Sequence, residues 1–172
     1  MSITPESRIH GACIAELVSS ICGEFPDLRL AIRDGLDRSS HTLTVLNPAC
    51  QQTVTVGIYM KYSRNRRSPW DYSYDRKHQE EVDRLFRSHG EVFTILIAGD
   101  DGYACINHSE LKVVLDDKFD DVEWIRVSRK LNESYRISGK DGSYARPLKR
   151  RAFPDRITAH IGDKFGLKLD SR

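Results

Sequence analysis

The residues best suited to bind a ligand follow an alternating stretch that runs from Val54 to Lys61. Apolar and polar residues alternate there, as in a half-buried strand. Three arginines and an aromatic residue come shortly after it: Arg64, Arg66, Arg67 and Trp70. Loops at strand ends often carry binding residues, and this one combines cations for phosphates with an aromatic face for stacking on bases. We therefore predict that Lys61 and these four residues contact nucleic acid.

A second outcome for this segment is also open. Aromatic side chains usually lie in the protein interior, so Trp70 and Tyr72 would fold back onto the core while the arginines stay in water. The loop would then be a solvated surface without a partner.

A second basic run lies nearer the C-terminus, at Arg146, Lys149, Arg150 and Arg151. We predict that it extends the nucleic-acid surface or binds an acidic protein. The charge pattern also allows internal pairing. Residues 100–123 hold eight acidic side chains against two lysines, and residues 126–156 hold ten basic side chains against three acidic ones. In that alternative the basic run pairs with the acidic residues from Asp116 to Asp121, within the chain or across a homodimer.

Most motifs of known chemistry are missing from the sequence. No P-loop, GxGxxG or GxSxG motif occurs, so neither nucleotide binding by a glycine-rich loop nor a nucleophile elbow has support. The histidines form no HxH or HxxxH pair and the cysteines form no CxxC pair, so we predict no metal site and no cofactor. Asp100 and Asp101 end an apolar run, but Asp101-Gly102 is typical of a hairpin turn, which is the interpretation adopted.

Length and composition fit one globular domain. The chain has 172 residues, of which 39% are hydrophobic and 30% are charged. No apolar run approaches the length of a membrane span, and the first residues lack the pattern of a secretory signal. We therefore expect a cytoplasmic protein with no membrane partner. In that compartment its four cysteines are expected to be reduced and mostly buried.

Periodicity and turn residues predict the order of the elements. The first part comprises a helix over residues 5–22, antiparallel strands over 28–32, 43–45 and 54–60, a helix from Asp75 to His89, and a buried central strand over 92–98. The second part comprises a strand over 103–106, a short helix begun by Asn107, a strand over 122–127, a hairpin of residues 135–138 and 143–146, and a short helix over 157–165.

This order predicts an α+β fold with a mostly antiparallel sheet and helices packed on it. The whole chain, residues 1–172, is expected to be a single domain. Its core would extend over about residues 5–127, followed by a basic hairpin and a short helix over about residues 128–166.

The first 98 residues, in the order α-β-β-β-α-β, resemble the core of the restriction-endonuclease-like (PD-(D/E)XK) superfamily. In that family a strand carries an acidic residue, any residue and then lysine, and the acids hold Mg²⁺, which activates water against a phosphodiester. Here the third strand ends Ile58-Tyr59-Met60-Lys61, so Lys61 stands at the family's lysine and Tyr59 replaces the acid. The resemblance implies that the remaining acids would come from Asp34, Asp37 and Glu16.

We therefore expect a non-catalytic module with a nuclease-like core that binds nucleic acid or another polyanion, because Lys61 lacks its acidic partner. One alternative is a divergent Mg²⁺-dependent nuclease that uses Glu16, Asp34, Asp37 and Lys61. Another is a protein-interaction or assembly subunit, in which Trp70, Tyr72 and Trp124 form an apolar patch and a homodimer pairs opposite charges.

Overall fold

A five-stranded sheet, here called the large sheet, forms the centre of the computed structural model, which describes residues 4–119 and 122–169. Its strands lie in the order β1 (Arg29–Asp34), β2 (Ser40–Asn47), β3 (Gln52–Tyr62), β5 (Val92–Ile97) and β6 (Tyr103–Asn107). Neighbouring strands are antiparallel except β3 and β5, which are parallel. The chain therefore has to cross over between β3 and β5.

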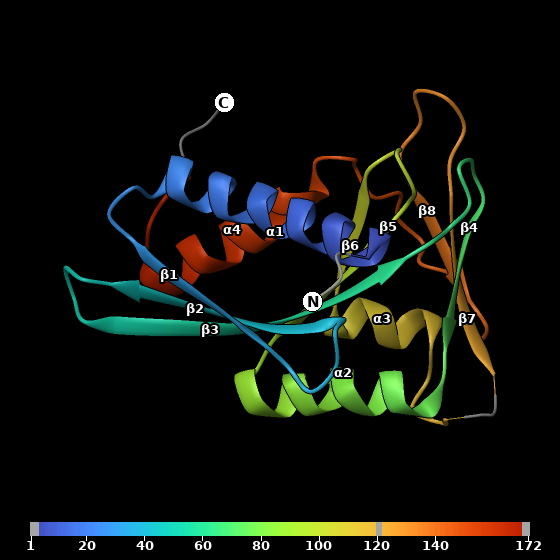
Figure 1. Cartoon of the computed structure of the whole chain (residues 1–172), viewed down its shortest axis with the longest axis horizontal. Helices are drawn as coiled ribbons and strands as arrows, with labels where there is room; N and C mark the ends of the chain where they lie inside the picture. Colours follow the sequence, from blue (N-terminus) through green and yellow to red (C-terminus); the bar gives the residue numbers. More distant parts are fainter. Residues whose placement is uncertain (1–3, 120–121, 170–172) are drawn as a thin grey trace.

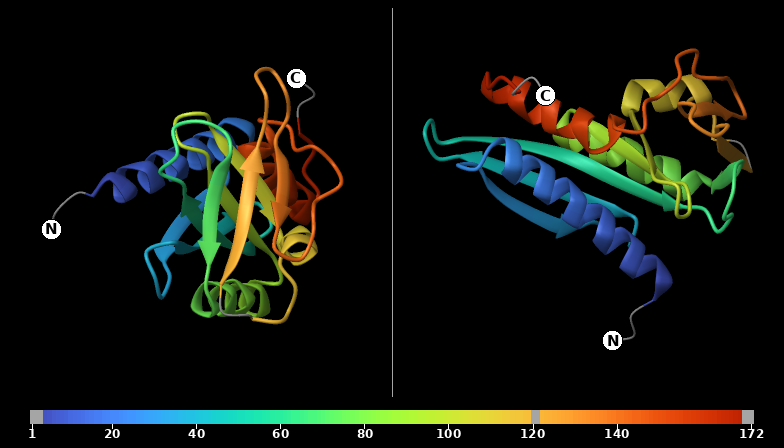
Figure 2. Two further views of the ribbon diagram at one scale, coloured as in Figure 1. Left: turned by 90° about the vertical axis from the view of Figure 1, so that its right-hand side faces the viewer. Right: turned by 90° about the horizontal axis from the view of Figure 1, so that it is seen from above.

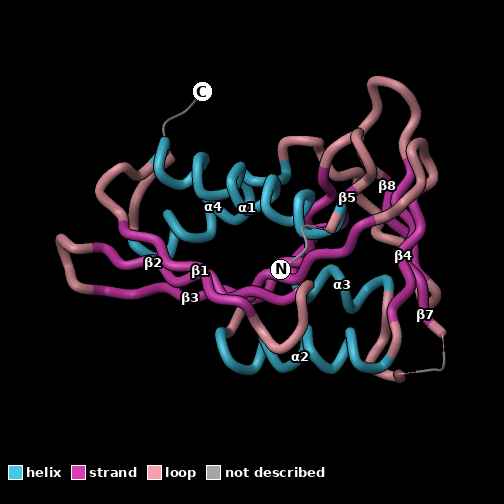
Figure 3. The backbone as a smooth tube through the Cα atoms, in the orientation of Figure 1, coloured by secondary structure: helices cyan, strands magenta, loops and turns pink. Residues whose placement is uncertain are grey.

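Helices cover both faces of the large sheet (Figures 1 and 3). One face carries α1 (Pro5–Glu24) and α4 (Ala152–Phe165), and the other carries α2 (Arg76–His89) and α3 (His108–Val114). Local signals fix several helix ends. Thr4 caps α1 by accepting a hydrogen bond from the Ser7 N–H at 3.1 Å, and Gly90 ends α2 in the left-handed conformation with φ of 77°.

A second, smaller sheet stands at one end of the large one (Figures 1 and 2). This small sheet consists of β4 (Trp70–Tyr74), β7 (Glu123–Ser128) and β8 (Arg136–Gly139), with β7 in the middle and both pairs antiparallel. Its inner face packs on the α2 side of the large sheet, because the aromatic residues of β4 belong to the same apolar cluster as Val82 and Leu85 of α2.

Strand β3 contributes to two separate cores because its side chains alternate between the faces of the large sheet. Ile58 and Met60 join the cluster under α1 and α4, whereas Tyr59 joins the cluster between α2 and the small sheet. Lys61 follows Tyr59 by two residues and therefore points toward α2. This alternation decides which side chains Lys61 can meet.

The α+β fold and most of the predicted elements are confirmed, with two corrections. Strand β4 was not predicted, although Trp70, Tyr72 and Tyr74 alternate with polar residues and all three are buried. The second half of the predicted terminal hairpin is wrong. Residues 143–146 form only one bridge, between Ser143 and Ser138, and β8 pairs with β7 instead.

None of the described helices combines the length and the apolar character that crossing a membrane requires. All four cysteines are free thiols, but the expectation that most are buried holds for only two of them. Cys13 and Cys105 are buried, whereas Cys22 and Cys50 are exposed.

Candidate nucleic-acid interface

Lys61 lies against His78 at the point where β3 approaches the first turn of α2. Its Nζ is 3.0 Å from Nδ1 and 3.3 Å from Nε2 of the His78 ring, and 5.1 Å from the centre of the Tyr74 ring. His78 is held by the start of its own helix, because Asp75 and His78 form a reciprocal capping box. The Asp75 N–H donates to His78 Nδ1 at 3.2 Å, which makes that nitrogen an acceptor.

Burial weakens the basicity of both partners. Desolvation lowers the pKa of Lys61 to about 8, although the carboxylates of Asp75 and Asp37 act in the opposite direction. Desolvation also lowers the pKa of His78, and the positive charge of Lys61 lowers it further. At neutral pH an ammonium group therefore lies against a neutral imidazole ring. Lys61 therefore remains positively charged at neutral pH and can bind an anion.

Tyr59 stands where the nuclease resemblance would require an acid, and its ring lies among aromatic rings. The side chain is fully buried, with ring centres 6.3 Å from Tyr74 and 6.4 Å from His78. Burial raises the pKa of the phenol well above its ordinary value, so the hydroxyl stays protonated. A neutral phenol does not supply the charged oxygen that Mg²⁺ needs at this position.

The other residues of the candidate nuclease set are dispersed. Asp37 lies near enough to raise the pKa of Lys61. Asp34 instead contacts His41, with Oδ1 3.1 Å from Nδ1, and its side chain is 91% exposed. Glu16 belongs to α1, which covers the opposite face of the large sheet from the one that Lys61 faces. The structure therefore brings only Asp37 toward Lys61.

The loop between β3 and β4, residues 63–69, is called the basic loop. Its two ends are anchored: the Ser63 N–H donates to the Ile97 carbonyl at 3.1 Å, and Ser68 Oγ accepts from the Arg129 N–H at 3.1 Å. Between these anchors the three arginines are exposed. Within residues 4–119 and 122–169, none of them makes an ion pair: Arg64, Arg66 and Arg67.

A pocket of about 400 Å³ lies beside the basic loop and joins it to Lys61. Lys61 and Arg64 both line it, together with hydroxyl and amide groups from Ser63, Asn65 and Ser73. Asp71 also lines the pocket, and its carboxylate accepts a hydrogen bond from Arg126 at 2.6 Å. Two cations beside neutral donors make a local environment that suits a phosphate group.

The turn between β5 and β6 connects the basic loop to the second basic run. Gly99 has φ of 55°, and a Cβ there would lie 2.7 Å from the Asn65 carbonyl oxygen, so the basic loop approaches this turn closely. The Asp101 carbonyl of the same turn accepts a hydrogen bond from Arg150. Arg66 and Arg150, distant in sequence, are thus both beside one turn, at the end where the β3–β4, β5–β6 and β7–β8 loops gather (Figure 1).

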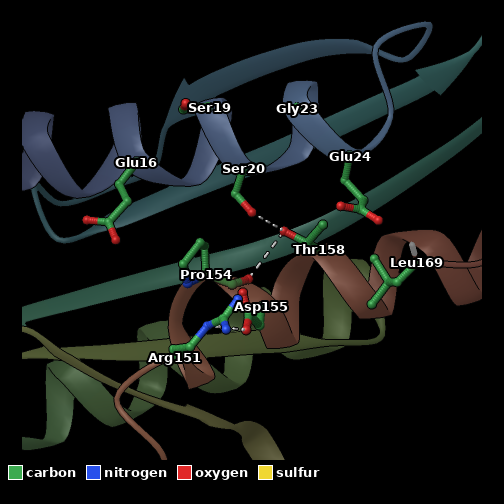
Figure 4. Close-up of a pocket in the computed structure, with 10 residues that line it drawn as sticks. All are labelled: Glu16, Ser19, Ser20, Gly23, Glu24, Arg151, Pro154, Asp155, Thr158 and Leu169. Atoms are coloured by element: carbon green, nitrogen blue, oxygen red, sulfur yellow. Dashed lines mark hydrogen bonds and ion pairs between the residues drawn. The ribbon is translucent and has the colours of Figure 1, made fainter. Parts of the chain in front are cut away.

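The rest of the second basic run divides between free and paired cations. Arg146 and Lys149 are exposed and make no ion pair with any residue that the structure describes. Arg151 lies 3.6 Å from Asp155, one helical turn further along. It also lines a groove of about 720 Å³ between α1 and α4, which Glu16 lines as well and in which Ser20 faces Thr158 (Figure 4). Ser20 and Thr158 share a hydrogen bond of 3.0 Å there.

Part of the C-terminal basic charge does pair with the chain's own acids, but with different ones from those predicted. Arg129 donates to both carboxylate oxygens of Asp101, and Arg156 donates to both of Glu110 at 2.6 Å. Tyr135 also donates to Asp101, at 2.7 Å, so this acid stabilises the turn, as a structural interpretation of Asp101 predicts. Within the predicted acidic partner segment, Asp120 and Asp121 lie outside the described residues.

The stacking role predicted for Trp70 is wrong in this structure. Its side chain is 2% exposed and packs edge-on against Tyr135, with ring centres 6.1 Å apart. Tyr72 is 3% exposed. The alternative in which these aromatics fold onto the core is the one observed, because β4 turns its even-numbered residues inward.

Three carboxylates from distant segments also approach one another at the far end of α3: Asp116, Glu123 and Asp141. Their ligand oxygens lie within 4.8 Å of one another, which the sequence, with its wide spacing, did not suggest. Each of them already accepts a hydrogen bond, and the Lys118 N–H donates to Asp116 at 2.7 Å. Gln79 donates to Glu123, and the Asp116 N–H donates to Asp141 at 3.0 Å.

Sequence reasoning missed His78 as the partner of Lys61. The signal for it was indirect. His78 is the third residue of the helix that Asp75 caps, and in the structure the first turn of this helix lies beside the end of β3.

Comparisons with protein-family models, curated protein sequences and solved structures each found no match to this chain.

Proposed function

We propose that this protein is a non-catalytic nucleic-acid-binding module whose main contact surface is the basic loop. One observation carries the proposal: Arg64, Arg66 and Arg67 are exposed and have no acidic partner among the described residues. Phosphate backbones attract such a cluster, because each contact releases condensed counterions. The nearby Arg150 and the pocket that holds Lys61 extend the positive surface.

A nuclease-like core is part of the proposal. The large sheet supports it, since α1, three antiparallel strands, α2 and a strand parallel to the third follow in that order. A metal-dependent nuclease is the less supported alternative. Tyr59 gives no carboxylate beside Lys61, and Glu16 lies on the other face of the large sheet. Binding without cleavage needs neither residue.

The test is a fluorescence-anisotropy titration of the full chain with labelled single-stranded and duplex oligonucleotides at two salt concentrations. We expect saturable binding that weakens as salt rises. The triple variant Arg64→Gln, Arg66→Gln, Arg67→Gln should bind about 100-fold more weakly at roughly 0.1 M salt, since each lost contact to a single strand removes about 0.7 decade of affinity there.

A matched control removes the same charge elsewhere. Arg29, Arg33 and Arg87 are also exposed, on β1 and at the end of α2. The triple variant of these residues to glutamine should keep affinity within about threefold, because a screened charge far from the ligand acts weakly. No saturable binding by the wild-type chain would overturn the proposal, as would equal losses in the two triple variants.

A further inference from the structure

The two tryptophans of the chain have opposite environments. Trp70 on β4 is buried, whereas 41% of Trp124 on β7 is exposed. Trp124 is exposed because the residues before and after it, Glu123 and Ile125, point inward and are fully buried. The Trp124 ring therefore presents a large aromatic surface on the open side of the middle strand.

The outer face of the small sheet surrounds Trp124 with polar and basic groups. Directly paired residues of neighbouring strands share a face. Trp124 is opposite Ser73, Arg126 is opposite both Asp71 and Ser138, and Ser128 is opposite Arg136. The Arg126 guanidinium lies 5.9 Å from the centre of the Trp124 ring and is bonded to Asp71. Arg136 is exposed and makes no ion pair within the described residues.

This face continues into the basic loop. Strand β4 begins directly after the loop, and Ser68 in the loop accepts a hydrogen bond from the N–H of Arg129, the residue that follows β7. Trp124 is four residues from Ser128 along β7, a distance of about 13 Å. The outer face of the small sheet is turned toward the viewer in the left-hand view of Figure 2, with the loops at its upper edge.

We propose that Trp124 is a stacking site for an unpaired nucleobase of a single-stranded nucleic acid that crosses the outer face of the small sheet. The strand's phosphates would face Arg126, Arg136 and the basic loop. The inference rests on the proposed function and deepens it by naming the ligand class. Single strands are selected because a base inside a duplex has both faces covered, whereas an unstacked base offers one face to the indole ring.

The charge of the surface favours this occupant over a second copy of the chain. The face and the adjoining loop carry five arginines and one carboxylate: Arg64, Arg66, Arg67, Arg126, Arg136 and Asp71. Two such faces would repel each other, whereas a phosphate backbone is attracted. Val122, two residues before Trp124, is also exposed, but two apolar side chains make a smaller patch than the core of a protein interface needs.

The test measures tryptophan fluorescence and anisotropy together on the full chain. The probes are a short oligothymidylate, the matching oligouridylate and a duplex of similar length. We expect both single strands to quench the fluorescence and the duplex to bind more weakly. Trp124→Phe should abolish the quenching and keep affinity within about threefold, since a phenyl ring still stacks. Trp124→Leu should weaken single-strand binding by about tenfold.

The outcomes separate the two proposals. Saturable binding to a single strand with unchanged fluorescence and no loss in Trp124→Leu would overturn the stacking site and leave the basic loop as the contact. Equal or tighter binding of the duplex would overturn the preference for single strands. Fluorescence that changes with protein concentration alone would show that a second copy covers Trp124, which also overturns the inference. No saturable binding at all would remove the proposed function itself. If Trp124→Leu does not fold, the comparison of wild-type quenching with that of Trp124→Phe still tests the stacking site.

Discussion

The arginines of the basic loop and those of α4 and the β7–β8 loop contrast within one molecule. Arg156 makes two hydrogen bonds of 2.6 Å to Glu110 and one of 2.8 Å to the Cys105 carbonyl, and Arg129 is paired with Asp101. Arg64, Arg66 and Arg67 have no such partners in the described residues. A charge that leaves water needs a partner, whereas one that stays in water does not.

The difference indicates which cations serve folding and which are free for a ligand. The paired arginines connect segments that are far apart in sequence: α4 to α3, and the β7–β8 loop to the β5–β6 turn. The unpaired arginines connect nothing within the described chain. Removing a paired arginine should therefore lower stability, and removing an unpaired one should lower affinity.

The largest expected effect on stability is at Arg156. The side chain of Glu110 is 11% exposed, so Arg156→Gln leaves a mostly buried carboxylate with Tyr144 as its remaining side-chain partner. We expect the free energy of unfolding to fall by about 3 kcal/mol. Urea denaturation followed by circular dichroism measures it. The control is Arg151→Gln, whose ion pair is 78% and 52% exposed and whose loss should cost under about 1 kcal/mol. Equal effects of the two changes would break the comparison.

The change Asp101→Asn would remove the ion pair of Arg129 and so make this arginine resemble those of the basic loop. Arg129 and Tyr135 lose a charged acceptor, so stability should fall by about 2 kcal/mol. The freed Arg129 lies next to Ser68 of the basic loop, so affinity for a single strand should rise about fivefold at roughly 0.1 M salt. Anisotropy and denaturation on the same variant check both. A loss of affinity would show that Asp101 shapes the ligand surface in some other way.

Lys61 gives a smaller, pH-dependent effect. With its pKa lowered to about 8, the ammonium loses its proton as pH rises from 7 to 9, and affinity should fall about fivefold. Lys61→Arg keeps its charge and should bind equally at both pH values. The free energy of unfolding should rise between pH 8 and 10.5, because the unfolded chain binds that proton while the folded chain has released it. Wild-type affinity that is constant across this window would exclude Lys61 from the contact surface.

The sequence predicted the large sheet well because its signals are local. Alternation in β3, the uniformly apolar β5 and the caps at Thr4, Asp75 and Gly90 act over a few residues, and each predicted element formed. It did not predict the small sheet, which joins β4 to strands about fifty residues later. A single strand such as Trp70–Tyr74 shows alternation but not its partner, so the burial of Trp70 and the exposure of Trp124 both depended on a pairing that local signals do not contain.

The same reason limited the prediction of the site. The exposure of Arg64, Arg66 and Arg67 could be predicted because they lie together in one loop, so no distant segment was needed for the prediction. The Lys61–His78 contact and the ion pairs of Asp101 and Glu110 each join distant segments, so charge counts could suggest internal pairing but could not name the partners.

The salt dependence of binding tests the central claim most directly. The dissociation constant for a short oligothymidylate should be measured across a range of salt concentrations for the wild type and the two triple arginine-to-glutamine variants. We predict that the slope of log Kd against log salt falls by about 2 when Arg64, Arg66 and Arg67 are replaced, and stays unchanged when Arg29, Arg33 and Arg87 are replaced. A slope that the basic-loop variant shares with the wild type would contradict the account.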